Sequence, residues 1–430
     1  MSCRALPMSS ESAPGQFPRP ENAPDNLPSL STRLKEIAVV FLRLGSLGFG
    51  GPQAHIAMQH DEAVIRRGWM SQEQFTEGVG LCEMLPGPAS TQMGIYVGYV
   101  RAGWLGAVLA GICFIAPAFV IEVIFSWLYF RFQGVPQLEG MFFGVAPVVI
   151  AIILAFCWKL GRKAVKDWSR GLIAVAAFAL LLIGGVNILL LFGLAALVGL
   201  LLYGPKKGPL SGIPILLPWP VLTLAQTVVA TVPPETLILS SFWGLERIGA
   251  YFWPLTLFFL KVGGTIFGGG LVIIPFIADE VVDQLGWLTP TEFLDGVAIG
   301  QFTPGPVVLT AAFIGYKVAG VLGALTATVA IFAPSFAFIL LAAPVLLRIR
   351  HNAWVKGSLQ AITPTALGAV AAATVPLAQN ALLQQTTPAS LVALGIGVAA
   401  FIALMRFRQP TWLLVLMGGG AGLLARGLLA

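Results

Sequence analysis

Long apolar runs recur along this chain, with short polar segments between them. Several runs approach the roughly 20 apolar residues that a helix needs to cross a bilayer. The pattern predicts an all-α membrane protein with about 13 membrane segments. A thirteenth crossing is expected near 213–232, in the proline-rich stretch between the halves. The other expected segments cover residues 37–57, 75–100, 104–130, 141–158, 171–184 and 187–203, then 252–277, 293–317, 319–347, 358–377, 389–405 and 411–428.

The chain is internally duplicated. The string FLRLGSLGFGGP, from Phe41, has a counterpart in FLKVGGTIFGGG, from Phe259, at an offset of 218 residues (259 − 41). The same offset relates DEAV to DEVV, GWM to GWL and the two Pro-Gly-Pro strings, and it becomes 217 where APAF matches APSF. The protein is expected to be two copies of one unit, with its chemistry where the copies meet.

This duplication sets the expected domain organisation. The first 30 residues are rich in Pro, Ser and Asn and lack the apolar core of a secretory signal, so they are expected to be a disordered cytoplasmic tail. The remaining expected units are an N-terminal repeat (31–204), a linker with an extra membrane span (205–250) and a C-terminal repeat (251–430).

Composition supports the membrane assignment. The chain is 57% hydrophobic and 10% charged, whereas soluble domains are about 25% charged. Its net charge of +6 comes from Lys and Arg in short loops, a placement that sets membrane topology and indicates no nucleic-acid partner. Four scattered cysteines and three histidines show no ligand spacing, so neither a metal nor a cofactor is expected. The oligomeric state stays open, with a homo-oligomer as one alternative.

The basic loops predict opposite orientations for the two copies. In the first half, basic residues follow the fourth segment (159–170), and in the second half they follow the third (348–356). If basic loops stay in the cytoplasm, the copies are inverted, and the linker must cross the membrane once. The N-terminus is then cytoplasmic and the C-terminus periplasmic. Arg66, Arg67 and Lys317 do not fit this topology. Inverted repeats around a site in the middle of the membrane are a recurrent transporter architecture.

Each copy carries Pro-Gly-Pro inside an apolar segment. Proline removes a backbone donor and clashes with the preceding turn, so each motif must break its helix. The flanking half-helices form either a hairpin that dips in and returns or a broken span. Free N–H groups where a helix restarts favour an anion, while a simple kink in a packed bundle is the alternative. The expected substrate-binding residues here are Pro86, Gly87, Pro88, Ser90, Thr91, Thr303, Pro304, Gly305 and Pro306.

Glycine clusters form a second motif before each Pro-Gly-Pro. Glycines permit exposed backbone amides around an oxyanion, or close approach of two helices. We expect a backbone cradle at Gly50 and Gly51, beside Pro52, and extend the assignment to Gly268 and Gly269 in the second copy.

Two cations occupy matching positions inside apolar runs. Arg43 and Lys261 each lie one turn before a glycine cluster. A cation inside the membrane is costly and usually has a functional partner. The pair is expected to converge on a dianion. The alternatives are that each reaches the membrane surface or pairs with a structural carboxylate.

Glu83 and Glu122 are the carboxylates expected to lie deepest, and both are proton-coupling candidates. Gln301 stands in the second copy where Glu83 stands in the first, which suggests a single protonatable site. Alternatively, Glu83 is a structural partner for Arg43 or Arg101.

Several signatures are absent from the sequence. There is no GxxxxGK[ST] phosphate-binding loop, which excludes direct use of ATP, and neither HExxH nor GxSxG is present. The absence of these motifs argues against an enzymatic function.

Together, FLRLGSLGFGGP, GWM, PGPAST and APAF, with their second copies, resemble the chromate ion transporter family over roughly residues 35–200 and 250–428. The resemblance implies a long-chain, two-domain member in a bacterial-type inner membrane that exports chromate and gives chromate resistance. It carries over Arg43, Gly50, Gly51, Pro52 and the first Pro-Gly-Pro as family positions. The second copy departs from the pattern at Gly270 and Gln301.

The expected function is a secondary transporter driven by the proton gradient or the membrane potential. A transporter of sulfate or another oxyanion and a passive anion channel are the alternatives. The expected partners are the oxyanion, protons and the lipid bilayer.

Overall fold

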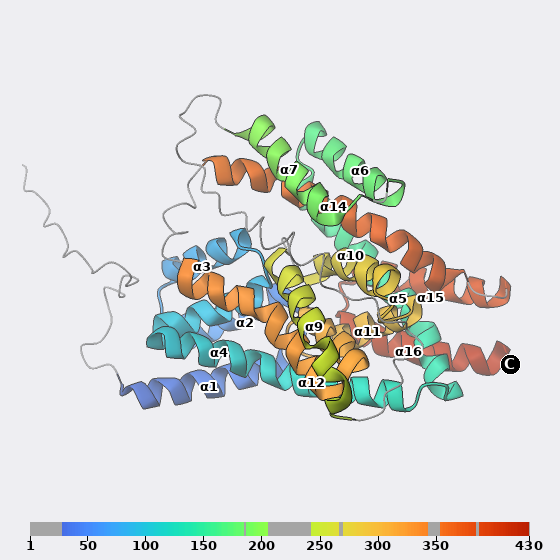
Figure 1. Ribbon diagram of the computed structural model, residues 1–430, viewed down its shortest axis with the longest axis horizontal. Coiled ribbons are helices and arrows are strands. Elements are labelled where there is room, and N and C mark those ends of the chain that lie inside the picture. Colours follow the sequence, from blue (N-terminus) through green and yellow to red (C-terminus); the bar gives the residue numbers. More distant parts are fainter. Residues whose placement is uncertain are drawn as a thin grey trace, which may run out of the picture.

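The computed structural model describes residues 28–184, 186–204, 242–265, 270–342, 353–383 and 387–429. In these ranges the chain forms fourteen α-helices (Figure 1), which confirms the predicted all-α class for the described residues. The predicted span at 213–232, most of the predicted disordered tail, and Gly268 and Gly269 lie outside them. The helices are α1 (Leu30–Leu47), α2 (Gly51–His60), α3 (Gln72–Met84), α4 (Ala89–Arg131), α5 (Pro136–Ala164), α6 (Trp168–Leu182), α7 (Ile188–Tyr203), α9 (Leu245–Thr265), α10 (Ile273–Ala278), α11 (Pro290–Phe302), α12 (Thr310–Ala337), α14 (Ala353–Leu382), α15 (Thr387–Arg406) and α16 (Thr411–Leu429).

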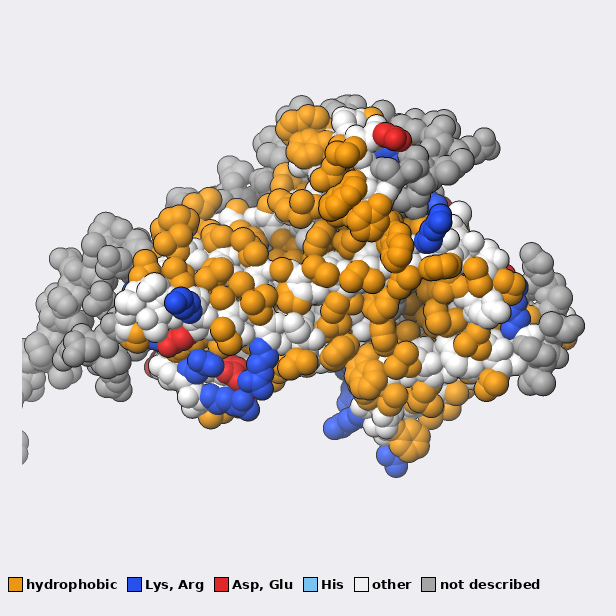
Figure 2. Space-filling view, turned by 90° about the horizontal axis from the view of Figure 1, so that it is seen from below, with side chains coloured by type: hydrophobic (Ala, Val, Ile, Leu, Met, Phe, Trp, Pro, Cys, Tyr) orange, Lys and Arg blue, Asp and Glu red, His pale blue; other side chains and the backbone are white. Residues whose placement is uncertain are grey.

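Five helical stretches among the described residues are long and apolar enough to cross a bilayer. Shorter apolar helices accompany them at 168–182, 188–203 and 411–426. On the face seen in Figure 2, hydrophobic side chains cover most of the surface and charged ones gather in a few places. These features indicate a multi-pass membrane protein, while the count of thirteen spans stays a prediction. The five long stretches are 89–131, 136–164, 307–341, 357–382 and 387–406.

The first helix of each half begins earlier than its apolar pattern predicted. Helix α1 begins at Leu30 instead of residue 37, and α9 begins at Leu245 instead of residue 252. The added turns are polar: Ser29 caps α1, and Glu246 lies in the first turn of α9. Hydropathy detects the apolar body of a helix and misses polar turns that extend beyond it.

The glycine and proline motifs interrupt helices where the sequence predicts. Helices α1 and α2 are separated at 48–50, and α3 and α4 at 85–88. In the second half, α11 and α12 are separated by Pro304-Gly305-Pro306 and a short 3-10 turn. Gly87 and Gly305 have φ values of 121° and 97°, a backbone conformation that favours glycine.

The helices that flank each Pro-Gly-Pro lie side by side. A Cβ on Gly78 of α3 would lie 2.5 Å from the Tyr96 ring of α4. A Cβ on Gly296 of α11 would lie 2.4 Å from the Phe313 ring of α12. In both cases the two residues lie almost equally far along the chain from the motif. The motif is therefore the tip of a helical hairpin, which is one of the two geometries that the sequence left open.

A second reversal follows each hairpin. Helix α4 has a non-helical backbone at Ala102 and Gly103, and α12 has one at Ala319 and Gly320. Gly103 (φ 67°, ψ −155°) occupies a region essentially restricted to glycine. The boundary that the sequence predicted between segments 75–100 and 104–130 is therefore present inside α4.

Helices from the two halves share one core. Helix α14 packs against α5, α6 and α7, and α5 also packs against α15 and α16. Figure 1 shows α6, α7 and α14 together at the top of the view. The larger hydrophobic cluster accordingly draws residues from both halves, such as Ile153 and Phe313, which are completely buried. A smaller cluster around Phe41 and Phe114 is built almost entirely from the first half.

Candidate functional site

The tips of the two helical hairpins lie in the interior and contact opposite halves. The N–H of Gly305 donates to the carbonyl oxygen of Gly48 at 2.8 Å. A Cβ on Gly305 would lie 2.6 Å from Ala118, and one on Gly87 would lie 2.6 Å from the Ser335 hydroxyl oxygen. Both halves of the chain therefore contribute backbone to one place. We call it the tip region, and it comprises residues 48–52, 86–91 and 303–306.

The glycine cluster of the first half opens α2 inside the tip region. Gly50 precedes the helix in a left-handed conformation, with φ 107°. Pro52 lies in the first turn, where its missing N–H costs nothing. No side chain caps this helix start, and a Cβ on Gly51 would meet no atom within 4 Å. The predicted cradle thus contains an uncapped helix start with open space beside Gly51.

Polar side chains form hydrogen bonds to the first turn of α4, directly after the Pro-Gly-Pro, and the sequence analysis did not assign them to the site. His55 bonds through Nε2 to the Gly48 carbonyl at 2.9 Å and through Nδ1 to the Ser90 hydroxyl at 3.4 Å. Gln59 Nε2 donates to the Ser90 carbonyl at 3.0 Å. His55 and Gln59 stand four residues apart on α2, and that spacing places them on one helix face. This spacing is a sequence signal that could have identified them.

Ser90 and Thr91 are both buried in the tip region, as the sequence assignment requires. The Thr91 hydroxyl has no hydrogen-bond partner among the described residues. The N–H groups of Thr91 and Gln92 donate to the Pro88 carbonyl at 2.9 and 3.0 Å. Pro88 has no N–H and the N–H of Thr91 is already used, so a ligand at this helix start would meet the N–H groups of Ala89 and Ser90.

Glu122 reaches the same region from α4. It is fully buried, and its Oε2 lies 2.8 Å from the Thr303 hydroxyl. Within the described ranges its second oxygen has no hydrogen-bond partner, and no Lys or Arg pairs with it. The prediction that Glu122 lies deep is confirmed. An ionised carboxylate buried without a cation is costly, so its charge is sensitive to any ion that approaches.

Glu83 does not lie deep, so that prediction is wrong. Its side chain is 47% exposed and faces Lys163 at 3.4 Å. The buried face of α3 carries Gly78, Leu81 and Cys82 toward its neighbours, and Glu83 points away from that face. Closeness to the Pro-Gly-Pro in sequence does not show which side of the helix a residue faces.

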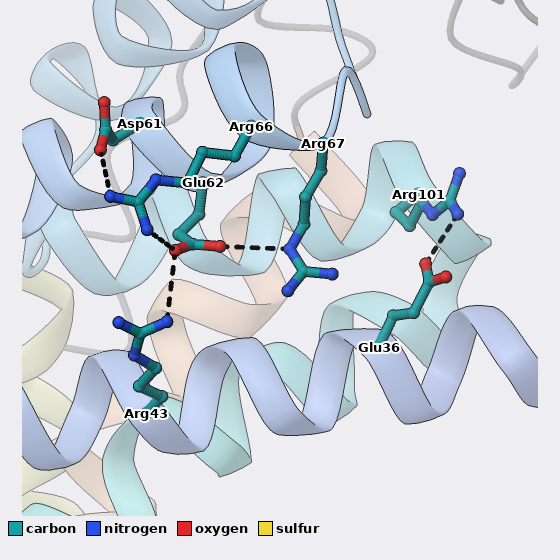
Figure 3. A network of polar contacts seen from close by, with 7 residues as sticks. All are labelled: Glu36, Arg43, Asp61, Glu62, Arg66, Arg67 and Arg101. Carbon is teal, nitrogen blue, oxygen red and sulfur yellow. Dashed lines mark hydrogen bonds and ion pairs between the residues drawn. The ribbon is translucent and has the colours of Figure 1, made fainter.

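Arg43 lies in a cluster of charged side chains at the surface (Figure 3). Its guanidinium is 61% exposed and lies 3.7 Å from Glu62, which is largely buried. Arg66 and Arg67 approach the same carboxylate at 3.0 and 3.1 Å, and Arg66 also pairs with Asp61. Three arginines therefore surround one carboxylate, in line with the expected alternative in which Arg43 pairs with a carboxylate.

Lys261 forms the matching pair in the second half, with Glu280. Both residues stand 218 positions after Arg43 and Glu62, so each half joins its first helix to a π turn by one ion pair. The second pair is more enclosed, since Lys261 is 9% exposed. Each cation is thus held by a carboxylate of its own half. For the two cations to converge on a dianion, as the sequence predicts, both of these ion pairs would have to break.

This difference predicts unequal effects on stability. Lys261→Gln leaves the partly buried Glu280 without its cation, and the upper limit of the cost is the roughly 3–5 kcal/mol of breaking a fully buried pair. Arg43→Gln leaves Glu62 with two arginines, so its cost is about 1 kcal/mol or less. Thermal unfolding of the purified variants in detergent measures both costs. Equal losses for the two variants would contradict this account.

A metal site is not found among the described residues, where no group of three or more His, Cys, Asp or Glu side chains gathers. Cys82 and Cys113 are buried and free. The candidate site is therefore made of backbone, hydroxyls, amides, the His55 imidazole and one carboxyl group. Such groups suit an oxyanion and protons.

Comparisons with known proteins show which family the chain belongs to. A family model described as chromate transporter matches residues 35–200 and 253–423. The chain is 34% identical over 404 residues to a probable chromate transport protein of Synechococcus elongatus, covering 91% of this chain and 95% of that one. It is 33% identical over 379 residues to the chromate transport protein of Cupriavidus metallidurans, covering 88% and 90%. No solved structure matches the chain. The chain belongs to the chromate transporter family, as a long-chain member with two matched segments.

Proposed function

We propose that the protein is a secondary transporter that exports chromate from the cytoplasm, driven by the proton gradient or the membrane potential. The observation that carries this proposal is the hydrogen bond from Gly305 to Gly48, which joins the hairpin tip of the second half to the glycine cluster of the first half at one buried place. A site between two repeats, reached from either side in turn, is the usual arrangement of secondary transporters.

Matching local features support two inverted repeats. The tips at Gly87 and Gly305 share the 218-residue offset, as do the capping boxes that begin with Ser71 and Thr289. The opposite placement of basic loops supports the inversion, with the N-terminus in the cytoplasm of a bacterial-type cell and the C-terminus in the periplasm. The proposed total of thirteen spans includes the linker crossing at 213–232.

The proposed substrate site is the tip region. Chromate is a tetrahedral dianion, and the uncapped start of α2, the restart of α4 and the hydroxyls of Ser90, Thr91 and Thr303 offer donors to such an ion. Arg43 and Lys261 are proposed to release their carboxylates and stabilise the dianion in transit. Glu122 is the proposed coupling group, because protonation would remove its repulsion for the anion.

Uptake into everted membrane vesicles tests this function. Vesicles that carry the protein, energised with a respiratory substrate, are expected to accumulate labelled chromate and to lose it when an uncoupler is added. Excess unlabelled sulfate measures the preference between the two oxyanions. Accumulation no greater than in empty vesicles would reject export. Flux that only follows the chromate gradient would indicate a channel.

Two cation variants test the proposed site. Arg43→Gln and Lys261→Gln are each expected to lower the initial rate of chromate uptake at least about tenfold, since loss of one charge-assisted contact costs about 1.5–3 kcal/mol. The controls Arg43→Lys and Lys261→Arg keep the charge and are expected to retain more activity. Normal rates in correctly inserted Gln variants would remove these cations from the mechanism.

A further inference from the structure

Helices α4 and α11 meet along a contact with a carboxyl–hydroxyl pair at each end. At one end the Glu122 carboxyl group of α4 faces the Thr303 hydroxyl, directly after α11. At the other end the Tyr129 hydroxyl of α4 donates to Asp295 of α11 at 2.7 Å. Between them the rings of Phe125 and Phe302 lie 5.6 Å apart. Helix α4 thus supplies the carboxyl group at one end of the contact, and α11 supplies the carboxyl group at the other end.

Asp295 has the features of a titratable group rather than a purely structural acceptor. It is 3% exposed, and its Oδ1 has no hydrogen-bond partner among the described residues. The nearby cation, Lys317, bonds instead to Glu292 at 2.8 Å, and Gln133 donates to the same carboxylate at 3.0 Å. If Asp295 only accepted a hydrogen bond from the Tyr129 hydroxyl, its second oxygen would be buried without a partner and without a function.

A cavity of about 380 Å³ gives water a route to this carboxyl group. Its lining includes Asp295, Tyr129 and Gln133, together with Glu139 and Arg426, which pair with each other at 2.6 Å and are about half exposed. A second cavity, of about 460 Å³, shares Tyr129 and continues beside Phe125 and Phe302. That second cavity is lined by apolar side chains, and Glu122 is not among its lining residues.

We propose that Asp295 is a second proton-binding site of the transporter, loaded from solution through the cavity that Glu139 and Arg426 line. The proton passes from a hydronium ion to Asp295 Oδ1, and Tyr129 continues to donate to Oδ2. This inference rests on the proposed function, because it concerns how protons drive chromate movement. It assigns one coupling carboxyl group to each end of a single helix contact.

Protonation at this site changes the contact between the helices. A hydrogen bond from Tyr129 to an ionised carboxylate is about twice as strong as one to a neutral carboxyl group. Loading a proton on Asp295 therefore weakens the α4–α11 contact at this end, and the same holds for Glu122 at the other end. Proton occupancy and the relative position of the two helices are thereby linked, and this linkage is what coupled transport requires.

Other charged groups set the field around Asp295. Glu292 lies one turn earlier on α11, Lys317 comes from α12, Glu139 from α5 and Arg426 from α16. Glu292 with Lys317 and Glu139 with Arg426 are each neutralised as a pair, so Asp295 is the one carboxyl group of this set without a cation among the described residues.

Two assays on the purified full-length protein in proteoliposomes test the inference. The first is chromate accumulation driven by an imposed pH difference of one unit. The second is exchange of labelled for unlabelled chromate at equal concentrations and equal pH, which requires no net proton movement. Asp295→Asn is expected to lower the accumulation ratio about tenfold, since one proton moved across one pH unit contributes a factor of ten. Its exchange rate is expected to stay within about twofold of wild type.

Two further variants sharpen the test. Glu139→Gln changes a carboxylate in the same cavity that already has a cation, so it is expected to retain both activities. Tyr129→Phe removes the hydrogen bond to Asp295 and is expected to move the pH at half-maximal accumulation by about one unit.

Each other outcome overturns the inference. The inference is wrong if the Asp295→Asn protein accumulates chromate like wild type. It is also wrong if this protein loses exchange as strongly as it loses accumulation. If Asp295→Asn does not fold, as judged by size-exclusion chromatography, Tyr129→Phe decides, and an unchanged pH profile rejects the role. A wild-type protein that exchanges no chromate would reject the proposed function, and the inference would fall with it.

Discussion

Glu122→Gln is expected to remove the contribution of one coupled proton to chromate accumulation. The variant keeps the size of the side chain and keeps an oxygen that can accept from Thr303, but it can no longer release or bind a proton. One proton that moves down a pH difference of two units contributes about 2.7 kcal/mol, or a hundredfold in the accumulation ratio. The variant is therefore expected to accumulate about one hundredth as much chromate as wild type under that gradient.

Ser126→Ala is the matched control for this prediction. Ser126 stands one turn after Glu122 on α4, and its hydroxyl donates to the Glu122 backbone carbonyl at 2.7 Å. Replacing it perturbs the same buried stretch without touching the carboxyl group. Proteoliposomes with an imposed pH gradient measure both variants. A Glu122→Gln protein that matches the Ser126→Ala protein in accumulation would show that Glu122 carries no coupling proton.

The second large effect is expected at Gly305. Gly305→Ala places a Cβ 2.6 Å from the Cβ of Ala118, in a residue whose φ of 97° strains any side chain. Strained backbone costs about 1–3 kcal/mol and overpacking about 1–3 kcal/mol more. Their sum is a large part of the 5–15 kcal/mol that usually separates folded from unfolded protein. Little folded protein is therefore expected in the membrane.

Two other glycines provide a graded comparison. At Gly87 the new Cβ would meet the ends of Gln92 and Ser335, which are side chains and can move, so Gly87→Ala is expected to cost less. At Gly80, in the middle of α3, a Cβ would meet nothing within 4 Å, and Gly80→Ala is expected to be neutral or slightly stabilising. Size-exclusion profiles and thermal unfolding of the three variants give the order. Equal behaviour of Gly305→Ala and Gly80→Ala would contradict the description of the tip.

The sequence predicted the helix breaks because proline and glycine act locally. Pro86 and Pro304 remove backbone donors wherever the chain goes next, and both breaks are observed. Whether the chain then continues or turns back depends on packing between residues far apart, such as Gly78 and Tyr96. The hairpin geometry could not be chosen without those contacts.

The depth of polar side chains was predictable only in part. Glu122 stands in the middle of a long apolar run, where a carboxylate that faced lipid would be costly, so the sequence favours a place inside the protein. Glu83 lies near a helix end, where one side is exposed, and its direction depends on which face packs against α4. Arg43 lies in an apolar run too, but its long side chain reaches Glu62 at the surface.

Asp295 and Tyr129 escaped the sequence analysis altogether. They are 166 residues apart in the chain, and although Asp295 lies in the duplicated string FTEGVG/FLDGVA, the sequence analysis gave neither residue a role. Their association follows from the packing of α4 against α11, which brings the first half against the second. A contact of this kind has no local signature.

The interleaving of the two halves also affects how the protein is made. Helix α14 fills the space beside α5, α6 and α7, yet Ala353 leaves the ribosome about 190 residues after Ala164. At 5–20 residues per second, the three earlier helices wait roughly 10 to 40 seconds in the bilayer before their partner arrives. During that interval their packing surfaces face lipid or an assisting insertion factor. Newly made chains are therefore most vulnerable to quality-control proteases in the period before the second half emerges.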